Sequence, residues 1–177
     1  MEKNKKLKKF IYDATPYVLI LIAVIVIKVY FIAPIQVNGS SMMSTLNDRD
    51  IMLLNKINYK INDIKRFDIV VIKYEDTHLI KRIIGLPGDK IEYKDNKLYI
   101  NDEYYEEKYL DENTITEDFT LEKIISLKEV PEDCYFVMGD NREDSLDSRS
   151  LGVFNKSEIE GNTSLTIFPF NRIGFKK

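Results

Sequence analysis

The sequence is poor in the residues that most often bind metals or cross-link a chain. It has one cysteine, Cys134, and one histidine, His78, among 177 residues. A lone cysteine can form neither an internal disulfide nor a cysteine-based zinc site, and a lone histidine excludes sites with two histidine ligands. Unpaired cysteines are more often small buried hydrophobic residues than nucleophiles, so we expect that role for Cys134. We expect no metal and no other cofactor.

Net charge is also low. The formal charge is −3, with 44% hydrophobic and 31% charged residues, which is typical of a globular protein and lacks the basic excess of a nucleic-acid-binding protein. The charges are unevenly placed, because lysines crowd the first ten residues and acids dominate residues 103–118. We therefore expect no nucleic-acid partner.

Only one long apolar run is present, at residues 17–35. As a helix it would be about 28 Å long, close to the roughly 30 Å hydrocarbon thickness of a bilayer. Lys28 lies past its middle, where its amine can reach the interface. The run predicts a basic cytoplasmic segment (1–15) and a transmembrane anchor (16–35), with the rest of the chain on the outer side.

A cleaved signal peptide and a buried core helix are the alternative interpretations of this run. Cleavage after Ala33 would need small residues around it, but Phe31 precedes it by two positions and Pro34 follows it. A core helix that is apolar on every face would need a much larger protein around it. A retained anchor is favoured.

Residues 36–177 are predicted to form one extracytoplasmic catalytic β domain. Runs rich in Val, Ile, Tyr and Phe alternate with turn residues, and long helical patterns are absent, which favours a barrel or sandwich. An acidic insertion is expected at about 102–128, in which the segment 101–118 is expected to be solvated and 121–128 is too short to assign. The fold class is thus mainly β, with a single transmembrane helix before a β-barrel or sandwich-like domain. The expected strands are 50–55, 68–74, 78–84, 90–93, 97–101, 134–138 and 163–168.

A hydroxyl-rich turn at residues 38–46 follows the apolar run closely. In the simpler interpretation, Gly39 makes a turn and the serines bind its backbone groups. In the other, one serine is a nucleophile held near the membrane surface.

A second group is Lys81, in the strand-like run 77–84. Alternation places Lys81 between Leu79 and Ile83 on one face and His78 on the other. Lys81 is either a surface lysine or a desolvated amine. Desolvation would lower its pKa and make it a general base able to take a proton from a serine. Only one of Lys81 and His78 can face that serine.

A third group is the polar stretch at residues 139–152, which is either an ordinary solvated loop or a hydrogen-bonded network that supports a site. Asp140, Asn141 and Asp144 have the spacing of a calcium loop. The mid-loop glycine and terminal glutamate of that loop are missing, and two arginines would repel a cation.

Taken together, these segments resemble the type I bacterial signal peptidases, the membrane-bound Ser-Lys proteases. Residues 41–46 (S-M-M-S-T-L) resemble that family's S-M-x-P-T-L, and 66–71 (R-F-D-I-V-V) its R-G-D-I-V-V. Residues 81–89 match K-R-I-I-G-L-P-G-D throughout, and 139–149 fit G-D-N-R-x-x-S-x-D-S-R at every fixed position.

The resemblance implies a role for each matched residue. Ser41 would be the nucleophile and Lys81 the general base. Ser145 would lie beside the lysine and orient it, with Asp147 and Arg149 as a structural pair nearby.

The oxyanion hole and two motif positions depart from the family pattern. The family uses the backbone N–H of the nucleophile and, in some members, a hydroxyl two residues earlier, where this chain has Gly39. Ser40 is not assigned that role. Ser44 replaces the usual proline and Phe67 the usual glycine, which predicts lower rigidity with the chemistry retained.

The implied function is that of a membrane-anchored serine endopeptidase. It would cleave N-terminal signal peptides from exported pre-proteins after small residues at −1 and −3, with those signal peptides and membrane lipid as partners. The alternatives are a catalytically impaired, membrane-tethered scaffold of the same fold and a specialised processing protease. A cytosolic self-cleaving repressor has similar chemistry, but the anchor argues against it.

Overall fold

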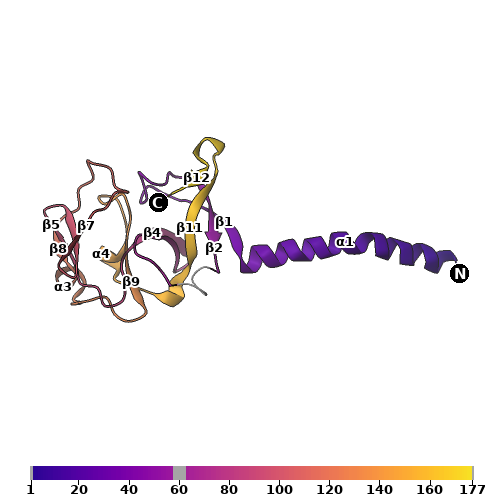
Figure 1. Ribbon diagram of the computed structural model, residues 1–177, viewed down its shortest axis with the longest axis horizontal. Coiled ribbons are helices and arrows are strands. Elements are labelled where there is room, and N and C mark those ends of the chain that lie inside the picture. The colour runs from indigo at the N-terminus through magenta and orange to yellow at the C-terminus, as the bar shows by residue number, and fades with distance from the viewer. Residues whose placement is uncertain (1, 58–62, 177) are drawn as a thin grey trace.

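The computed structural model describes residues 2–57 and 63–176, and the side chains at 2–7 and 27–30 lie outside that description. One long helix projects from a β-rich domain (Figure 1). The helices are α1 (Glu2–Tyr30), α3 (Leu121–Ile125), α4 (Ser148–Leu151) and the 3-10 turns η1 (Lys156–Glu158) and η2 (Phe170–Arg172). The strands are β1 (Ile32–Gln36), β2 (Ile51–Asn55), β3 (Ile69–Tyr74), β4 (Thr77–Gly85), β5 (Ile91–Lys94), β6 (Lys97–Ile100), β7 (Glu103–Tyr105), β8 (Phe119–Thr120), β9 (Cys134–Met138), β10 (Phe154–Asn155), β11 (Ile159–Phe168) and β12 (Gly174–Phe175).

Helix α1 contains one stretch, Lys8–Val26, that is long and apolar enough to cross a membrane, and none of that stretch is buried against the protein. The helix expected to reach residue 35 ends at Tyr30 instead. Residues 32–36 pair with β2 as an antiparallel edge strand, and Pro34 could not continue a helix there. The side chain of Lys28, and the interfacial role expected for it, lie outside the described residues.

Two antiparallel sheets make up the β domain, so the predicted mainly β fold is confirmed. The larger sheet has the order β1-β2-β11-β3-β4-β9-β10, with β12 beside β11, and the smaller one has the order β7-β6-β5-β8. All seven expected strands are present, and β11 begins at Ile159, before the expected residue 163. The order places β1 and β2, which flank the hydroxyl-rich turn, in the same sheet as β4.

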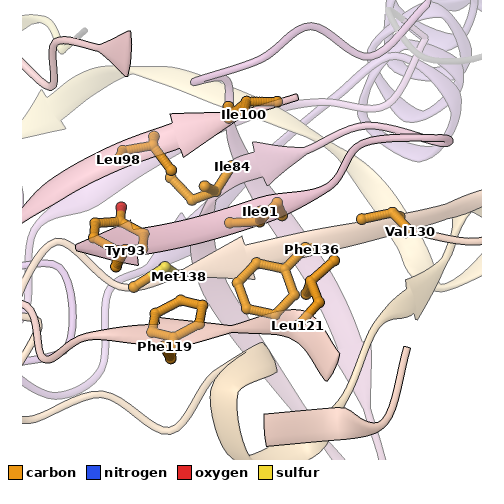
Figure 2. Close-up of a cluster of buried hydrophobic side chains, with 10 residues drawn as sticks. All are labelled: Ile84, Ile91, Tyr93, Leu98, Ile100, Phe119, Leu121, Val130, Phe136 and Met138. Carbon is orange, nitrogen blue, oxygen red and sulfur yellow. The ribbon is translucent and has the colours of Figure 1, made fainter. Parts of the chain in front are cut away.

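The smaller sheet packs against the larger one through a buried apolar cluster (Figure 2). Phe136 and Met138 from β9 meet Tyr93 from β5 and Phe119 from β8 in this cluster, and the Tyr93 and Phe119 rings lie 5.0 Å apart. Phe119 lies just past the segment 101–118 that was expected to be solvated, and within that segment most residues are exposed and only Thr116 is buried.

Candidate active site

Lys81 is buried in the middle of β4, with 2% of its surface exposed. Strand β3 flanks β4 on one side and β9 on the other, and residues from Ile80 to Gly85 are all buried. The Lys81 Nζ atom donates a hydrogen bond to Ser145 Oγ over 3.1 Å. Of the two environments considered for this lysine, the structure has the desolvated one.

Burial lowers the pKa of Lys81 to about 8. The carboxylates of Asp147, Asp140 and Asp144 act in the opposite direction, while the Arg149 guanidinium adds to the lowering. Near neutral pH a fraction of this amine is uncharged and able to accept a proton. His78, by contrast, lies at the exposed start of β4, with its Nε2 atom 3.3 Å from Glu160.

The loop after β9 (residues 139–147) holds Ser145 opposite Lys81. Asp147 is fully buried, and it accepts hydrogen bonds from the Gly139 amide at 3.0 Å and from Arg149 Nη2 at 2.8 Å. Burial alone would raise the pKa of Asp147, but the hydrogen bonds and charge of Arg149 outweigh it and hold the pKa below its usual value. The Asp147 carboxylate also caps α4 by accepting from the Arg149 amide. This stretch is a hydrogen-bonded network rather than a solvated loop.

Ser41 lies against the same loop. Its carbonyl oxygen accepts from the Asn141 amide at 3.0 Å. A Cβ atom built on Gly139 would overlap both that carbonyl oxygen and Ser145 Oγ. Gly139 thus lets the backbone of Ser41 approach the hydroxyl that binds Lys81. Among the described residues Lys81 Nζ bonds to Ser145 and not to the Ser41 hydroxyl, so the Ser41–Lys81 pair stays a prediction.

Gly39 occupies a left-handed conformation, with φ of +90° and an open space where a side chain would begin. Its amide donates to Asp48 Oδ1 over 2.8 Å. It has no hydroxyl with which to complete an oxyanion hole. The Ser40 hydroxyl is engaged elsewhere, because it donates to Asp144 Oδ2 over 2.5 Å.

The Arg82–Asp140 ion pair was not foreseen from the sequence, and both side chains are buried. Arg82 Nε and Nη2 donate to the two Asp140 oxygens over 2.8 and 2.6 Å, and Thr45 Oγ1 donates to the same carboxylate over 2.5 Å. Thr45 comes from the turn that contains Ser41, Arg82 from the strand that bears Lys81, and Asp140 from the loop that bears Ser145. One carboxylate therefore joins all three segments. Alternation placed Arg82 opposite Lys81, but it could not show that both faces of β4 are buried.

A second buried arginine, Arg142, connects the insertion to the loop after β9. Its Nη2 atom donates to Glu107 over 2.5 Å, its Nη1 atom to Tyr93 and Thr116, and its Nε atom to the Gly139 carbonyl over 3.1 Å. Glu107 and Thr116 both belong to the stretch that was expected to be solvated. The insertion instead orders the backbone on which Ser145 is carried.

Phe67 has a left-handed backbone, with φ of +69°. Its ring packs on Tyr109 and Tyr105, with centroids 5.4 and 6.5 Å away, and its carbonyl accepts from Arg82 Nη1. A glycine would adopt this backbone without strain. Aromatic packing against the insertion offsets the strain in this chain.

Comparison with known proteins identifies the family to which this chain belongs. Residues 11–168 match the family described as "Signal peptidase, peptidase S26". The chain is 41% identical to signal peptidase I of Bacillus amyloliquefaciens, over 97% of this chain and 95% of that protein. It is 38% identical to signal peptidase I S of Bacillus subtilis (strain 168), over 97% and 96%. The chain belongs to the signal peptidase family.

A crystal structure of signal peptidase I from Enterococcus faecalis V583 superposes with a TM-score of 0.53 at 39% identity, covering 57% of this chain and 97% of that one. In this signal peptidase family member the Lys81–Ser145 hydrogen bond involves neither Ser44 nor Phe67, and the Phe67 ring packs on Tyr105 and Tyr109 of the insertion. Among residues 2–57 and 63–176, no three His, Cys, Asp or Glu side chains group closely enough to hold a metal ion.

Proposed function

We propose that this protein is a membrane-anchored serine endopeptidase that removes signal peptides from exported pre-proteins, with Ser41 as nucleophile and Lys81 as general base. The observation that carries the proposal is the environment of Lys81. It is a buried amine with a pKa lowered to about 8, and it is bound to Ser145 in the loop that also holds the Ser41 backbone. Membership of the signal peptidase family supplies the class of reaction.

In the first half of the reaction, neutral Lys81 removes the proton from Ser41 Oγ as the oxygen attacks the carbonyl carbon of the scissile bond. The resulting oxyanion lies near the Ser41 amide, the donor that the family resemblance implies. Collapse of this tetrahedral intermediate breaks the C–N bond, and Lys81 passes its proton to the leaving amine. An ester then joins Ser41 to the signal peptide.

In the second half, neutral Lys81 takes a proton from water, whose oxygen attacks the ester carbonyl. The C–O bond to Ser41 breaks, and the proton returns to Ser41 Oγ. Ser145 orients the lysine in both halves through its hydrogen bond to Nζ. Since each half needs the uncharged amine, the rate should rise with pH through the pKa of Lys81, about 8.

The anchor sets where the reaction takes place. Helix α1 leads into β1 after a single residue, and the turn with Ser41 follows β1 directly. A lysine-rich N-terminus favours the cytoplasmic side, which places the β domain on the outer side. A pre-protein whose own apolar segment lies in the bilayer would present its cleavage site at the same height. Small residues at −1 and −3 are the specificity that the resemblance implies.

The test uses the full chain in detergent with one purified pre-protein, and the products are resolved by electrophoresis. Ser41→Ala and Lys81→Ala should each abolish cleavage while the far-ultraviolet circular dichroism spectrum stays unchanged. Ser44→Ala, which removes an exposed hydroxyl from the same turn, should retain activity and serves as the matched control. Cleavage by Ser41→Ala would overturn the assignment. A folded wild type without cleavage would favour the membrane-tethered scaffold.

A further inference from the structure

Ser40, the residue before the predicted nucleophile, is held from two directions by the loop after β9. Its hydroxyl donates to Asp144 Oδ2 over 2.5 Å, and its carbonyl oxygen accepts from Asn141 Nδ2 over 3.2 Å. Its neighbour Ser41 accepts from the Asn141 amide. Of these contacts, only the one to Asp144 fixes the Ser40 side chain.

The turn needs such a restraint because of Gly39. A glycine has more backbone freedom than any other residue, and nothing lies within 4 Å of the position where a Cβ of Gly39 would be. Rotation about Gly39 is opposed by the bond from its amide to Asp48 and by the Asn141 bonds to the Ser40 and Ser41 carbonyls, and the Asp144 bond is the restraint that acts on the Ser40 side chain. A hydroxyl bonded to a carboxylate is a strong restraint, since hydrogen bonds to charged acceptors are about twice as strong as neutral ones.

We propose that Ser40 and Asp144 are positioning residues, a hydrogen-bonded tether that holds the turn bearing Ser41 against the loop bearing Ser145 and so sets the distance between the Ser41 hydroxyl and the Lys81 amine. This inference rests on the proposed Ser41–Lys81 chemistry. Proton transfer requires the two atoms to approach to about 2.6–3.2 Å, and a misplacement of about 1 Å can cost on the order of 100-fold in rate. The tether acts on the reaction only through Ser41.

Asp144 has a second effect, through its charge. The charged groups that act most on Lys81 are Asp147, Arg149, Asp140 and Asp144, three from the loop after β9 and Arg149 from α4. Asp144 is exposed, and its negative charge favours the protonated lysine. Removing that charge should ease deprotonation of Lys81, whereas removing the Ser40 hydroxyl should leave the charge in place. The two residues can therefore be separated experimentally.

The experiment measures kcat and its pH profile for the full chain in detergent, with a saturating signal-peptide substrate. Ser40→Ala should lower the high-pH plateau of kcat about tenfold with no change in the pH midpoint, because only the tether is lost. Ser40→Thr, which keeps a hydroxyl, should restore most of the plateau. Asp144→Asn keeps an oxygen that can accept from Ser40, so its plateau should fall less, and its midpoint should move to lower pH.

Glu143→Gln is the matched control, because it removes one charge from the neighbouring exposed position and Glu143 is not among the main groups that shift the pKa of Lys81. Its midpoint should move less than that of Asp144→Asn. A wild-type kcat plateau for Ser40→Ala, or a loss confined to KM, would overturn the tether. Ser41→Ala separates the two proposals. If it is inactive while Ser40→Ala behaves as wild type, only the tether fails, and if it is active, the proposed function fails first.

Discussion

Replacing Lys81 by methionine should abolish catalysis and at the same time stabilise the fold. Methionine fills a similar volume without a charge, so it removes the cost of burying an ammonium group. The pKa of Lys81 falls from 10.5 to about 8 in the folded protein. At 1.36 kcal/mol per pKa unit, this difference corresponds to about 3 kcal/mol of destabilisation when the lysine is charged in both states. Loss of the hydrogen bond to Ser145 offsets about 1 kcal/mol of the gain.

The dependence on pH has a definite sign. Because the folded pKa lies below the unfolded one, the unfolded chain binds more protons between about pH 8 and 10.5, and the wild type gains stability as pH rises through that window. The advantage of Lys81→Met, about 2–3 kcal/mol, should therefore be full below pH 8 and disappear by about pH 10.5.

Urea unfolding of the full chain in detergent, followed by circular dichroism at several pH values, measures this difference. Lys73→Met, at an exposed position on β3, is the matched control. It should change neither the free energy of unfolding nor the pH dependence of that free energy, and it should keep the activity. A less stable Lys81→Met protein at neutral pH, or a stability difference that does not change between about pH 7 and 10, would refute the argument from desolvation.

The remaining predictions concern the contacts that hold the active-site segments together, and urea unfolding measures each. Asp140→Asn should lower the free energy of unfolding by about 3–5 kcal/mol, because it leaves the buried Arg82 charge uncompensated, and a loss below about 1 kcal/mol would contradict this. Glu107→Gln should cost about 1.5–3 kcal/mol through its weakened bonds to Arg142, and wild-type stability would show that the insertion is not coupled to the loop. Phe67→Gly relieves a strained backbone but loses two ring contacts, so we expect a net loss of about 1–3 kcal/mol, and a gain would show that strain dominates.

The strands were predictable where β-branched and aromatic residues follow one another without interruption, as in β3, β4 and β9. The segments β7 and β8 were missed because acidic neighbours hide their apolar residues, and two- or three-residue strands have no periodicity of their own. The end of α1 was placed too late because residues 32–35 are as apolar as the helix before them. This stretch becomes a strand because it pairs with β2, which follows it in the chain after the hydroxyl-rich turn.

For the candidate site, the sequence by itself determined the chemical groups and their local order. Ser41 comes two residues after Gly39, Lys81 lies within a strand, and Ser145 and Asp147 share a polar loop, as the motifs indicated. Tertiary structure decided how those groups behave. Whether Lys81 is a solvated ammonium or an amine with a lowered pKa depends on the coverage of β4 by β3, β9 and the loop after β9, because desolvation is a property of everything packed around a group and not of its neighbours in the chain.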